Sequence, residues 1–231
     1  MNLLNSLPVW EKLAKHIIWA QLGKIEDKDI LDFGSGTGIT ADYFAENNNV
    51  IAVEPNIEML KNQIKYNNYT QLIGSIDRLR ELDNNSFDVI ICHNVLEYAE
   101  DREQIVNEFY RLLRRGGILS IVKHNRNGRV MQMAVLLNDF ETANNILDGQ
   151  NGNASKFGTI NYYDDEDILN WCSDFTLDKK YGLRTFWDLQ QNQEIQEKAE
   201  WQRKMIELEM RVSEHKDFQN IAFLHHLIFK K

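Results

Sequence analysis

Cysteine is scarce in this chain, which limits the chemistry that it can carry. Cys92 and Cys172 are the only two, and neither has a neighbour at metal-ligand spacing. We expect both to be reduced, buried thiols. His225 and His226 are adjacent in an expected strand, where neighbouring side chains point to opposite faces. The sequence therefore predicts no metal site.

Long apolar runs are also missing. The longest, at 118–122 and 133–137, are far shorter than the roughly 20 residues that a helix needs to cross a bilayer. Near the start of the sequence, Pro8, Glu11 and Lys12 interrupt the apolar character early, which is unlike a secretory signal. We therefore expect no membrane partner and a cytoplasmic location.

Net positive charge is absent as well. The formal charge of −9 argues against broad nucleic-acid affinity, because phosphate neutralisation supplies most of that binding, although it leaves room for a local basic patch. The 231 residues suffice for one well-buried core but are few for two generous domains. We therefore expect a single domain over residues 1–231.

Strands and helices alternate through the first half of the sequence. After an amphipathic helix at 8–24, strands are expected at 29–33, 50–54, 71–74, 87–92 and 118–123, and helices at 39–46, 57–66 and 102–114. The glycine pair at 116–117 is the expected stop of the last helix. This alternation favours an open parallel sheet with right-handed crossovers.

The alternation breaks after the fifth strand. We expect an inserted helix at 129–147, a mobile loop around 151–153 and 158, a helix at 164–173, and strands near 176–186 and 220–229 that flank a charged helix at 189–213. The predicted fold class is α/β: a Rossmann-like, seven-stranded, mostly parallel sheet with helices on both faces. A helical insertion over 125–160 would follow strand 5.

The most informative stretch runs from a strand into Gly34-Ser35-Gly36-Thr37-Gly38 and on into a helix. Glycines let the backbone approach a ligand at the carboxyl edge of a sheet. Their alternate spacing fits neither the dinucleotide nor the P-loop template. Asp32 would also place a carboxylate where a pyrophosphate should sit. S-adenosylmethionine reverses that repulsion, because its sulfonium and ammonium groups attract a carboxylate.

Glu54 supplies a second test of this cofactor. It ends the second strand, 20 residues after Gly34, where an acid can accept hydrogen bonds from ribose hydroxyls. Together with Asp32 and the three glycines it predicts S-adenosylmethionine as the cofactor. Two alternatives stay open: Asp32 could only stabilise the loop, and Glu54 could be a strand-end charge.

Several segments resemble the motifs of the class I S-adenosylmethionine-dependent methyltransferases. DFGSGTG is similar to their first motif, AVEPNIEML to the second, GSIDRLRELDNNSFDVIICHNVLEY to the third and fourth, and RLLRRGGILSI to the sixth. The resemblance covers residues 28–124. It implies that Gly34, Ser35, Gly36 and Gly38 line the cofactor, that Ile76 and Asp77 lie against its adenine, and that His93 and Asn94 lie beside the methyl donor. Asp77 could equally cap the turn at 77–80.

Basic residues are concentrated where an acceptor is expected. No acid occurs from 109 to 138, whereas Arg111, Arg114, Arg115, Lys123, Arg126 and Arg129 lie there. In a chain of net charge −9 this predicts an acceptor that is anionic or attached to phosphate. The candidates for binding it are Lys123, Arg126, Arg129 and, further on, Arg184. The first three arginines of the run could instead be a solvated helix end.

Outside these motifs the chain resembles a narrower group, the bacterial methyltransferases that esterify 5-carboxymethoxyuridine at the wobble position of tRNA. HNVLEYAED, the stretch 125–139 and GLRTFWD carry this resemblance. It implies a carboxylate acceptor, which is ionised at neutral pH and needs no general base, and catalysis through positioning for in-line displacement. The chain departs from that group in its short segment ahead of the first helix and in Arg115, which replaces a proline.

Other interpretations remain open from the sequence. Arg184 could hold a strand-end carboxylate inside the protein rather than the acceptor. The protein could be a small-molecule O- or N-methyltransferase, with His93 or His124 as its general base. It could also be a binding module that keeps the fold without the activity.

Overall fold

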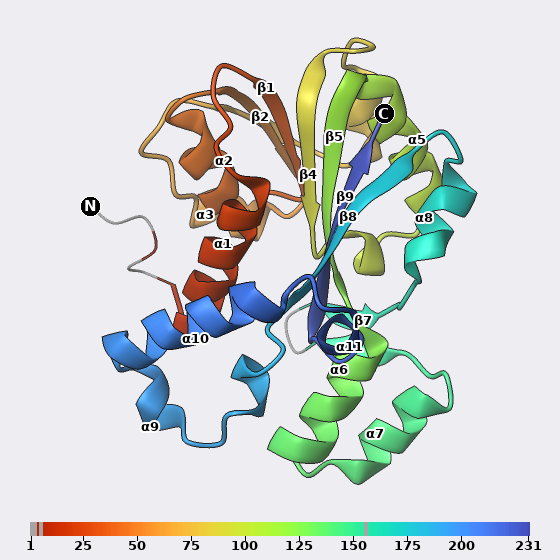
Figure 1. The fold of residues 1–231 in the computed structure, drawn as a ribbon. Helices are drawn as coiled ribbons and strands as arrows, with labels where there is room; N and C mark the ends of the chain where they lie inside the picture. The colour runs from red at the N-terminus through yellow and green to blue at the C-terminus, as the bar shows by residue number, and fades with distance from the viewer. Residues whose placement is uncertain (1–3, 5–6, 155–156) are drawn as a thin grey trace. The chain divides into compact units, whose positions relative to one another are not determined.

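The computed structural model describes residues 4, 7–154 and 157–231, and Figure 1 shows its ribbon. The described chain divides into two compact units that alternate along the sequence. The glycine-loop unit comprises residues 24–122, 163–179 and 227–231. The insertion unit comprises the residues up to 23, together with 123–162 and 180–226.

A seven-stranded sheet has the strand order β3-β2-β1-β4-β5-β9-β8. β1 is parallel to β2 and to β4, and the pairs β2–β3 and β4–β5 are also parallel. β9 runs antiparallel to β5, because Gly116 N–H bonds the Lys231 carbonyl at one end and Asn125 N–H bonds the Phe223 carbonyl at the other. The predicted α/β fold with a mostly parallel seven-stranded sheet is confirmed. The strands are β1 Asp29–Phe33, β2 Asn49–Glu54, β3 Thr70–Ile73, β4 Phe87–His93, β5 Leu113–His124, β8 Thr176–Leu183 and β9 Leu224–Lys230.

The glycine-loop unit is built on a dry apolar core. Leu31 and Ile90, from adjacent strands, are fully buried, as is Phe109, whose ring meets that of Phe33 edge to face at 5.3 Å. The helices of this unit are α2 Ile39–Ala45, α3 Ile57–Lys61, α4 Ile76–Arg80, α5 Arg102–Leu112 and α8 Asp165–Trp171. The acidic start of α8 is a reciprocal capping box between Asp164 and Asp167.

The insertion unit is mainly helical. Its elements are α1 Val9–Leu22, α6 Arg126–Met131, a π-helical turn Gln132–Leu136, α7 Phe140–Leu147, the strands β6 Gly152–Ala154 and β7 Gly158–Ile160, and the helices α9 Gln193–Gln196, α10 Ala199–Val212 and α11 Lys216–Gln219. α6 lies directly against the backbone near Ala222. A Cβ at Gly128 would lie 2.0 Å from the Ala222 carbonyl oxygen, so only glycine fits there.

Three predictions for the insertion unit were wrong. The expected single helix 129–147 is two helices, because the chain turns at Asn138, whose φ is +52°, and Asp139 then caps α7 by accepting the Thr142 N–H at 3.0 Å. The expected mobile loop around 151–158 contains the antiparallel hairpin β6–β7. The helix expected at 189–213 is likewise divided into a 3₁₀ turn, α9 and α10.

Two helix ends in the glycine-loop unit also differ from the prediction. α3 ends at Lys61 rather than near Tyr66, because the following residues bond elsewhere: Asp42 accepts the N–H groups of Tyr66 and Asn67 at 2.5 and 2.7 Å. The stop expected at the glycine pair 116–117 was misplaced. α5 ends at Leu112, and the glycines lie inside β5.

The described residues bear on the expectations for cysteines, membrane-spanning helices and metal sites. Both cysteines are free and buried, as expected. None of the described helices is long and apolar enough to span a membrane. Within the same residues, no group of three or more His, Cys, Asp or Glu is arranged to hold a metal ion.

The buried His226 makes the stability of the fold depend on pH. Burial lowers the pKa of its imidazole to about 3, and its Nδ1 lies 2.7 Å from Gln21 Oε1 of α1. Between pH 7 and pH 5 the unfolded chain gains a proton at this residue and the folded chain does not. We therefore expect about 2 kcal/mol of stability to be lost over that range through His226 alone.

Urea unfolding at pH 7 and pH 5, compared between the wild type and His226→Gln, measures this loss. The glutamine variant should lose less stability on acidification by about that amount. Equal losses in the two proteins would show that His226 does not titrate in this way.

Candidate cofactor and acceptor sites

The glycine loop takes a conformation that needs its glycines. Gly34, Gly36 and Gly38 have φ of +75°, +57° and +82°, a region that side chains disfavour. Gly34 and Ser35 donate their N–H groups to the Val53 carbonyl at 2.8 and 3.1 Å, which fixes the loop to the end of β2. The loop then leads into α2, with Gly38 at the N-cap position.

Neighbouring side chains also restrict this loop, and the sequence did not identify them. A Cβ at Gly34 would lie 2.2 Å from Val95 Cγ2, and one at Gly38 would lie 2.1 Å from the Tyr69 hydroxyl. At Gly36 the nearest atom would be the Met59 terminal methyl at 3.3 Å. The loop is therefore tightly packed at its two ends and more open at its middle glycine.

Glu54 connects two turns of the glycine-loop unit. Its Oε2 accepts the Gly36 N–H at 2.7 Å and its Oε1 accepts the Asn56 N–H at 2.9 Å. The side chain is 7% exposed. Each carboxylate oxygen has a second lone pair, so these bonds leave capacity for a ribose hydroxyl. Glu54 is thus more than a strand-end charge, and the loop-holding role is compatible with ligand binding.

Asp32, His93 and Asn94 lie at or just after strand ends of the same unit. Asp32 is 3% exposed in β1, the strand that leads into the glycine loop. His93 ends β4, and its Nε2 lies 2.8 Å from Ser120 Oγ. Asn94 has a φ of +56° and donates its N–H to the Val122 carbonyl at 2.7 Å. A non-glycine residue in that conformation is often part of a functional site.

Ile76 and Asp77 begin the short helix α4. Ile76 is half-buried against the core. Asp77 Oδ1 accepts the Ser75 N–H at 2.7 Å, and this bond holds the pKa of the exposed carboxyl below its usual value. Asp77 thus holds the turn that precedes α4, at Ser75, rather than the expected turn at 77–80. Its adenine contact stays a prediction.

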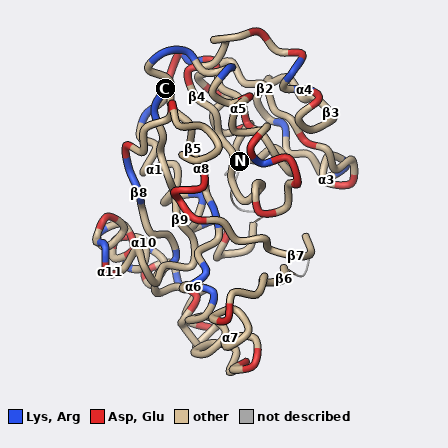
Figure 2. Tube along the Cα trace, turned by 90° about the vertical axis from the view of Figure 1, so that its right-hand side faces the viewer, with Lys and Arg blue, Asp and Glu red and all other residues tan. Residues whose placement is uncertain are grey.

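Arg126 and Arg129 hold the insertion together. Arg126 Nη1 donates to the carbonyls of Ile146 and Gln150 at 3.1 and 2.8 Å, and its guanidinium lies 4.6 Å from the Tyr162 ring centroid. Arg129 bonds Gln132, and also donates to the Asn153 carbonyl at 3.1 Å. Figure 2 marks the basic positions in blue where β5 runs into α6.

Lys123 and His124 end β5. Lys123 is only 3% exposed. Burial is the main reason that the pKa of His124 falls to about 4, and the charges of Arg129, Arg184 and Lys123 lower it further. The imidazole is thus neutral at pH 7 and a weak base.

Arg184 forms the internal ion pair that the sequence left open. Its Nε donates to Asp188 Oδ2 at 2.8 Å, and its Nη2 contacts Asp188 Oδ1. The sequence did not identify Glu209 as part of this region. This buried acid accepts the N–H groups of Thr185, Phe186 and Trp187.

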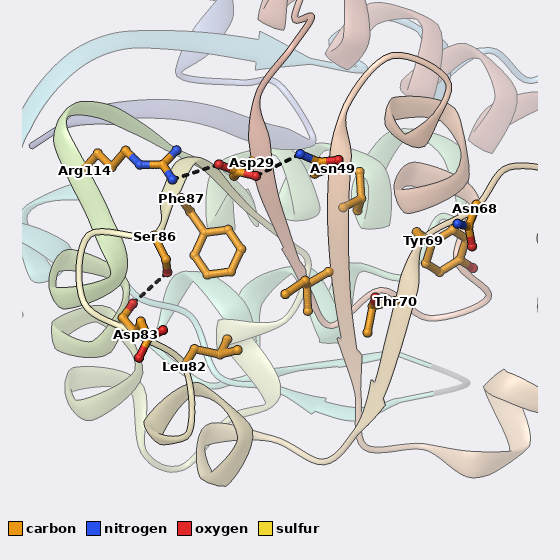
Figure 3. A pocket seen from close by; sticks show the side chains of 12 residues that line it. Asp29, Asn49, Asn68, Tyr69, Thr70, Leu82, Asp83, Ser86, Phe87 and Arg114 are labelled. Carbon is orange, nitrogen blue, oxygen red and sulfur yellow. Dashed lines mark hydrogen bonds and ion pairs between the residues drawn. The ribbon is translucent and has the colours of Figure 1, made fainter.

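A cavity lies at the amino ends of β1 and β2, and none of the proposed cofactor or acceptor residues lines it. Figure 3 shows Asp29, at the start of β1, between Arg114 and Asn49. Arg114 pairs with Asp29 at 2.8 Å and with Asp88 at 2.7 Å. Open parallel sheets bind ligands at the opposite, carboxyl ends of their strands. Arg114 therefore has an internal role rather than that of the solvated helix end considered from the sequence.

Residues 31–121 match a family model described as a methyltransferase domain. Arsenite methyltransferase of Mus musculus is 29% identical over 114 residues, which cover 42% of this chain and 30% of that protein. A ubiquinone biosynthesis O-methyltransferase of Rickettsia canadensis is 29% identical over 138 residues, covering 56% of this chain and 55% of that protein. The chain thus spans about half, or less, of the length of these relatives.

Solved structures resemble a larger part of the chain. An S-adenosylmethionine-dependent methyltransferase from Mesorhizobium loti has a TM-score of 0.60 and 14% identity, covering 99% of this chain and 100% of that one. One from Archaeoglobus fulgidus has a TM-score of 0.59 and 14% identity, covering 96% and 94%. The methyltransferase fold is confirmed.

The contacts of Glu54 predict a specific loss in the variant Glu54→Gln. Glutamine has only one side-chain oxygen. In the variant, its amide NH₂ group would therefore face one of the two backbone N–H groups, of Gly36 or Asn56, that Glu54 accepts in the wild type. A hydrogen bond to a charged group contributes about 1.5–3 kcal/mol, and we expect a loss of stability of this size in urea unfolding.

The matched control is Glu58→Gln, because Glu58 lies exposed on α3 and pairs only at the surface with Lys61. That change should cost at most about 1 kcal/mol. Equal effects of the two changes would contradict the role assigned to Glu54.

Proposed function

We propose that this protein transfers a methyl group from S-adenosylmethionine to an acceptor that carries an anionic group. The observation that carries the proposal is the glycine loop held by Glu54 inside a segment that matches a methyltransferase domain. Asp32, Gly34, Ser35, Gly36, Gly38, Glu54, Ile76, Asp77, His93 and Asn94 are the proposed cofactor residues.

The residues present fit this cofactor. Gly36 has a φ of +57°, and its nearest neighbour at the Cβ position is the flexible Met59 methyl at 3.3 Å, so the loop backbone is exposed to a ligand without a side chain of its own. Asp32 and Glu54 are buried carboxylates beside this loop, and they suit the cationic and hydroxyl groups of the ligand. When bound, S-adenosylmethionine supplies an electrophilic methyl group on a positively charged sulfur.

The finer proposal is that the acceptor is a carboxylate, and specifically that of a modified wobble uridine in tRNA. A carboxylate oxygen would form the new bond to the methyl carbon while the bond from that carbon to sulfur breaks, leaving a neutral ester and a neutral thioether. No proton needs to move. This agrees with a His124 imidazole whose pKa of about 4 makes it a poor base.

A small-molecule acceptor is the second candidate. The relatives named for arsenite and for ubiquinone biosynthesis favour it. In that case His93, whose Nε2 lies against Ser120 Oγ, would be the candidate for the base.

The cofactor proposal is tested by calorimetry with S-adenosylmethionine and ADP. The wild type should bind the first and not the second, since Asp32 repels a diphosphate. Asp32→Asn should weaken S-adenosylmethionine binding by about 10- to 100-fold, the value of a charge-assisted hydrogen bond. Asp83→Asn, at an exposed position, should have no effect. Binding of ADP in place of S-adenosylmethionine would refute the proposal.

The acceptor proposal is tested by transfer of labelled methyl to bulk tRNA that lacks the wobble ester. We expect transfer to tRNA, with kcat/KM nearly constant between pH 6 and pH 8 because the carboxylate stays ionised. The label should be released by mild alkali, as an ester requires. Transfer to small phenols but not to tRNA, with a rate that rises with pH, would favour the second candidate instead.

A further inference from the structure

The loop after β8 holds one arginine in a strained and well-defined position. Arg184 has a φ of +58°, in the left-handed region that non-glycine residues rarely adopt. Such conformations cost free energy and persist where the surrounding structure determines them. The conformation of Arg184 is held by contacts to its backbone and to its guanidinium.

Glu209 holds the backbone of this loop from α10. Its side chain is 2% exposed, and its two oxygens accept three successive N–H groups, from Thr185 at 2.8 Å, Phe186 at 2.8 Å and Trp187 at 3.1 Å. Burial raises the pKa of Glu209, and the three backbone N–H bonds counter this by favouring the carboxylate. The residues that follow Arg184 are thereby fixed.

The guanidinium itself is fixed on two sides. Asp188 binds its Nε and Nη2 edge, and the side chains of Arg184 and Asp188 are only 11% and 8% exposed. The group also lies over two rings, 4.6 Å from the centroid of Phe223 and 5.0 Å from that of Trp10. These contacts restrain the orientation of the plane of the guanidinium.

One edge of the guanidinium has no partner among the residues that the structure describes. Arginine has five N–H donors, and the hydrogen bonds of Arg184 to described residues use only Nε and Nη2. Nη1 makes no hydrogen bond to any residue within 7–154 or 157–231. It therefore presents two N–H groups in a fixed direction.

The surroundings of this edge are rich in positive charge. Arg129 and His124 face the same Phe223 ring, at 5.9 and 5.5 Å. Lys123, Arg129 and Arg184 together lower the pKa of His124 beyond the effect of burial. Asp188 pairs with Arg184 itself. The charge of a bound anion would be stabilised by this arrangement.

We propose that the free Nη1 edge of Arg184 binds an anionic oxygen of the methyl acceptor, and that Arg184 thereby determines which acceptors are accepted. Asp188 and Glu209 are then positioning residues, which orient Arg184 without touching the acceptor. This inference rests on the proposed function, and the ligand chemistry is an oxyanion, whether the acceptor's carboxylate or its phosphate.

The direct test is an NMR titration of the full chain, following the Arg184 Nε–H and Trp10 indole N–H signals at constant ionic strength. The probes are acetate, inorganic phosphate and neutral acetamide, which has the shape of acetate without its charge. We expect saturable shifts with acetate or with phosphate and none with acetamide. Saturation by acetate alone points to the carboxylate of the acceptor, and saturation by phosphate alone points to its phosphate.

Variants then separate an acceptor contact from a merely structural one. Arg184→Gln should abolish the saturable shift of the Trp10 signal, and Arg184→Lys, which keeps the charge but loses the planar fork, should weaken anion binding about 10- to 100-fold. In methyl transfer, Arg184→Lys should raise KM with a smaller change in kcat. Arg211→Gln, at an exposed position of α10, is the control and should match the wild type.

Equal shifts with acetate, phosphate and acetamide in the wild type would overturn the proposal, even if the variants fail to fold. Unchanged anion binding in folded Arg184→Gln would do the same. Calorimetry with S-adenosylmethionine keeps the two ideas apart. A protein that binds this cofactor but not the anions overturns only the role of Arg184, whereas one that binds the anions but not the cofactor overturns the proposed function.

Discussion

The glycine loop of this protein depends on one carboxylate, that of Glu54. Its two oxygens accept backbone N–H groups from Gly36 and Asn56, which lie in the turns after β1 and after β2. The Val53 carbonyl next to it holds the N–H groups of Gly34 and Ser35. The end of β2 therefore determines the shape of the glycine loop. The position of Gly36 is a consequence of this cross-strand contact as much as of the glycine itself.

Much of the parallel sheet could be predicted because its signals are local. The apolar strands and the glycine loop are each read from a few consecutive residues. β1 to β4 lie where those residues predicted them, whereas β5 begins at Leu113, within the helix expected at 102–114. The end of α3 could not be predicted this way. It depends on Asp42, which bonds Tyr66 and Asn67 from 24 and 25 residues away. Periodicity carries no information on such a contact, and the helix was predicted too long.

The basic cluster shows the same limit for the candidate acceptor site. From the sequence, Arg126 is one cation in a segment without acids. In the structure its guanidinium bonds carbonyls of Ile146 and Gln150, 20 and 24 residues further along the chain. Charge counted along a sequence therefore overstates the charge that is free to bind a ligand. Arg184 illustrates this limit. Asp188 accepts hydrogen bonds from its Nε and Nη2, which leaves only Nη1 to bind a ligand.

In each of the two units, a buried glutamate holds a loop by accepting its backbone N–H groups. Glu54 and Glu209 are buried acids that accept backbone N–H groups in the chain that follows a strand, and each precedes or supports a residue proposed to contact a ligand. A carboxylate oxygen has two lone pairs, so holding a loop and binding a ligand do not exclude each other. The loss of ligand affinity in a variant of such an acid therefore does not by itself assign its role. Only a comparison of affinity with the stability of the same variant can separate a lost ligand contact from a loop that has changed shape.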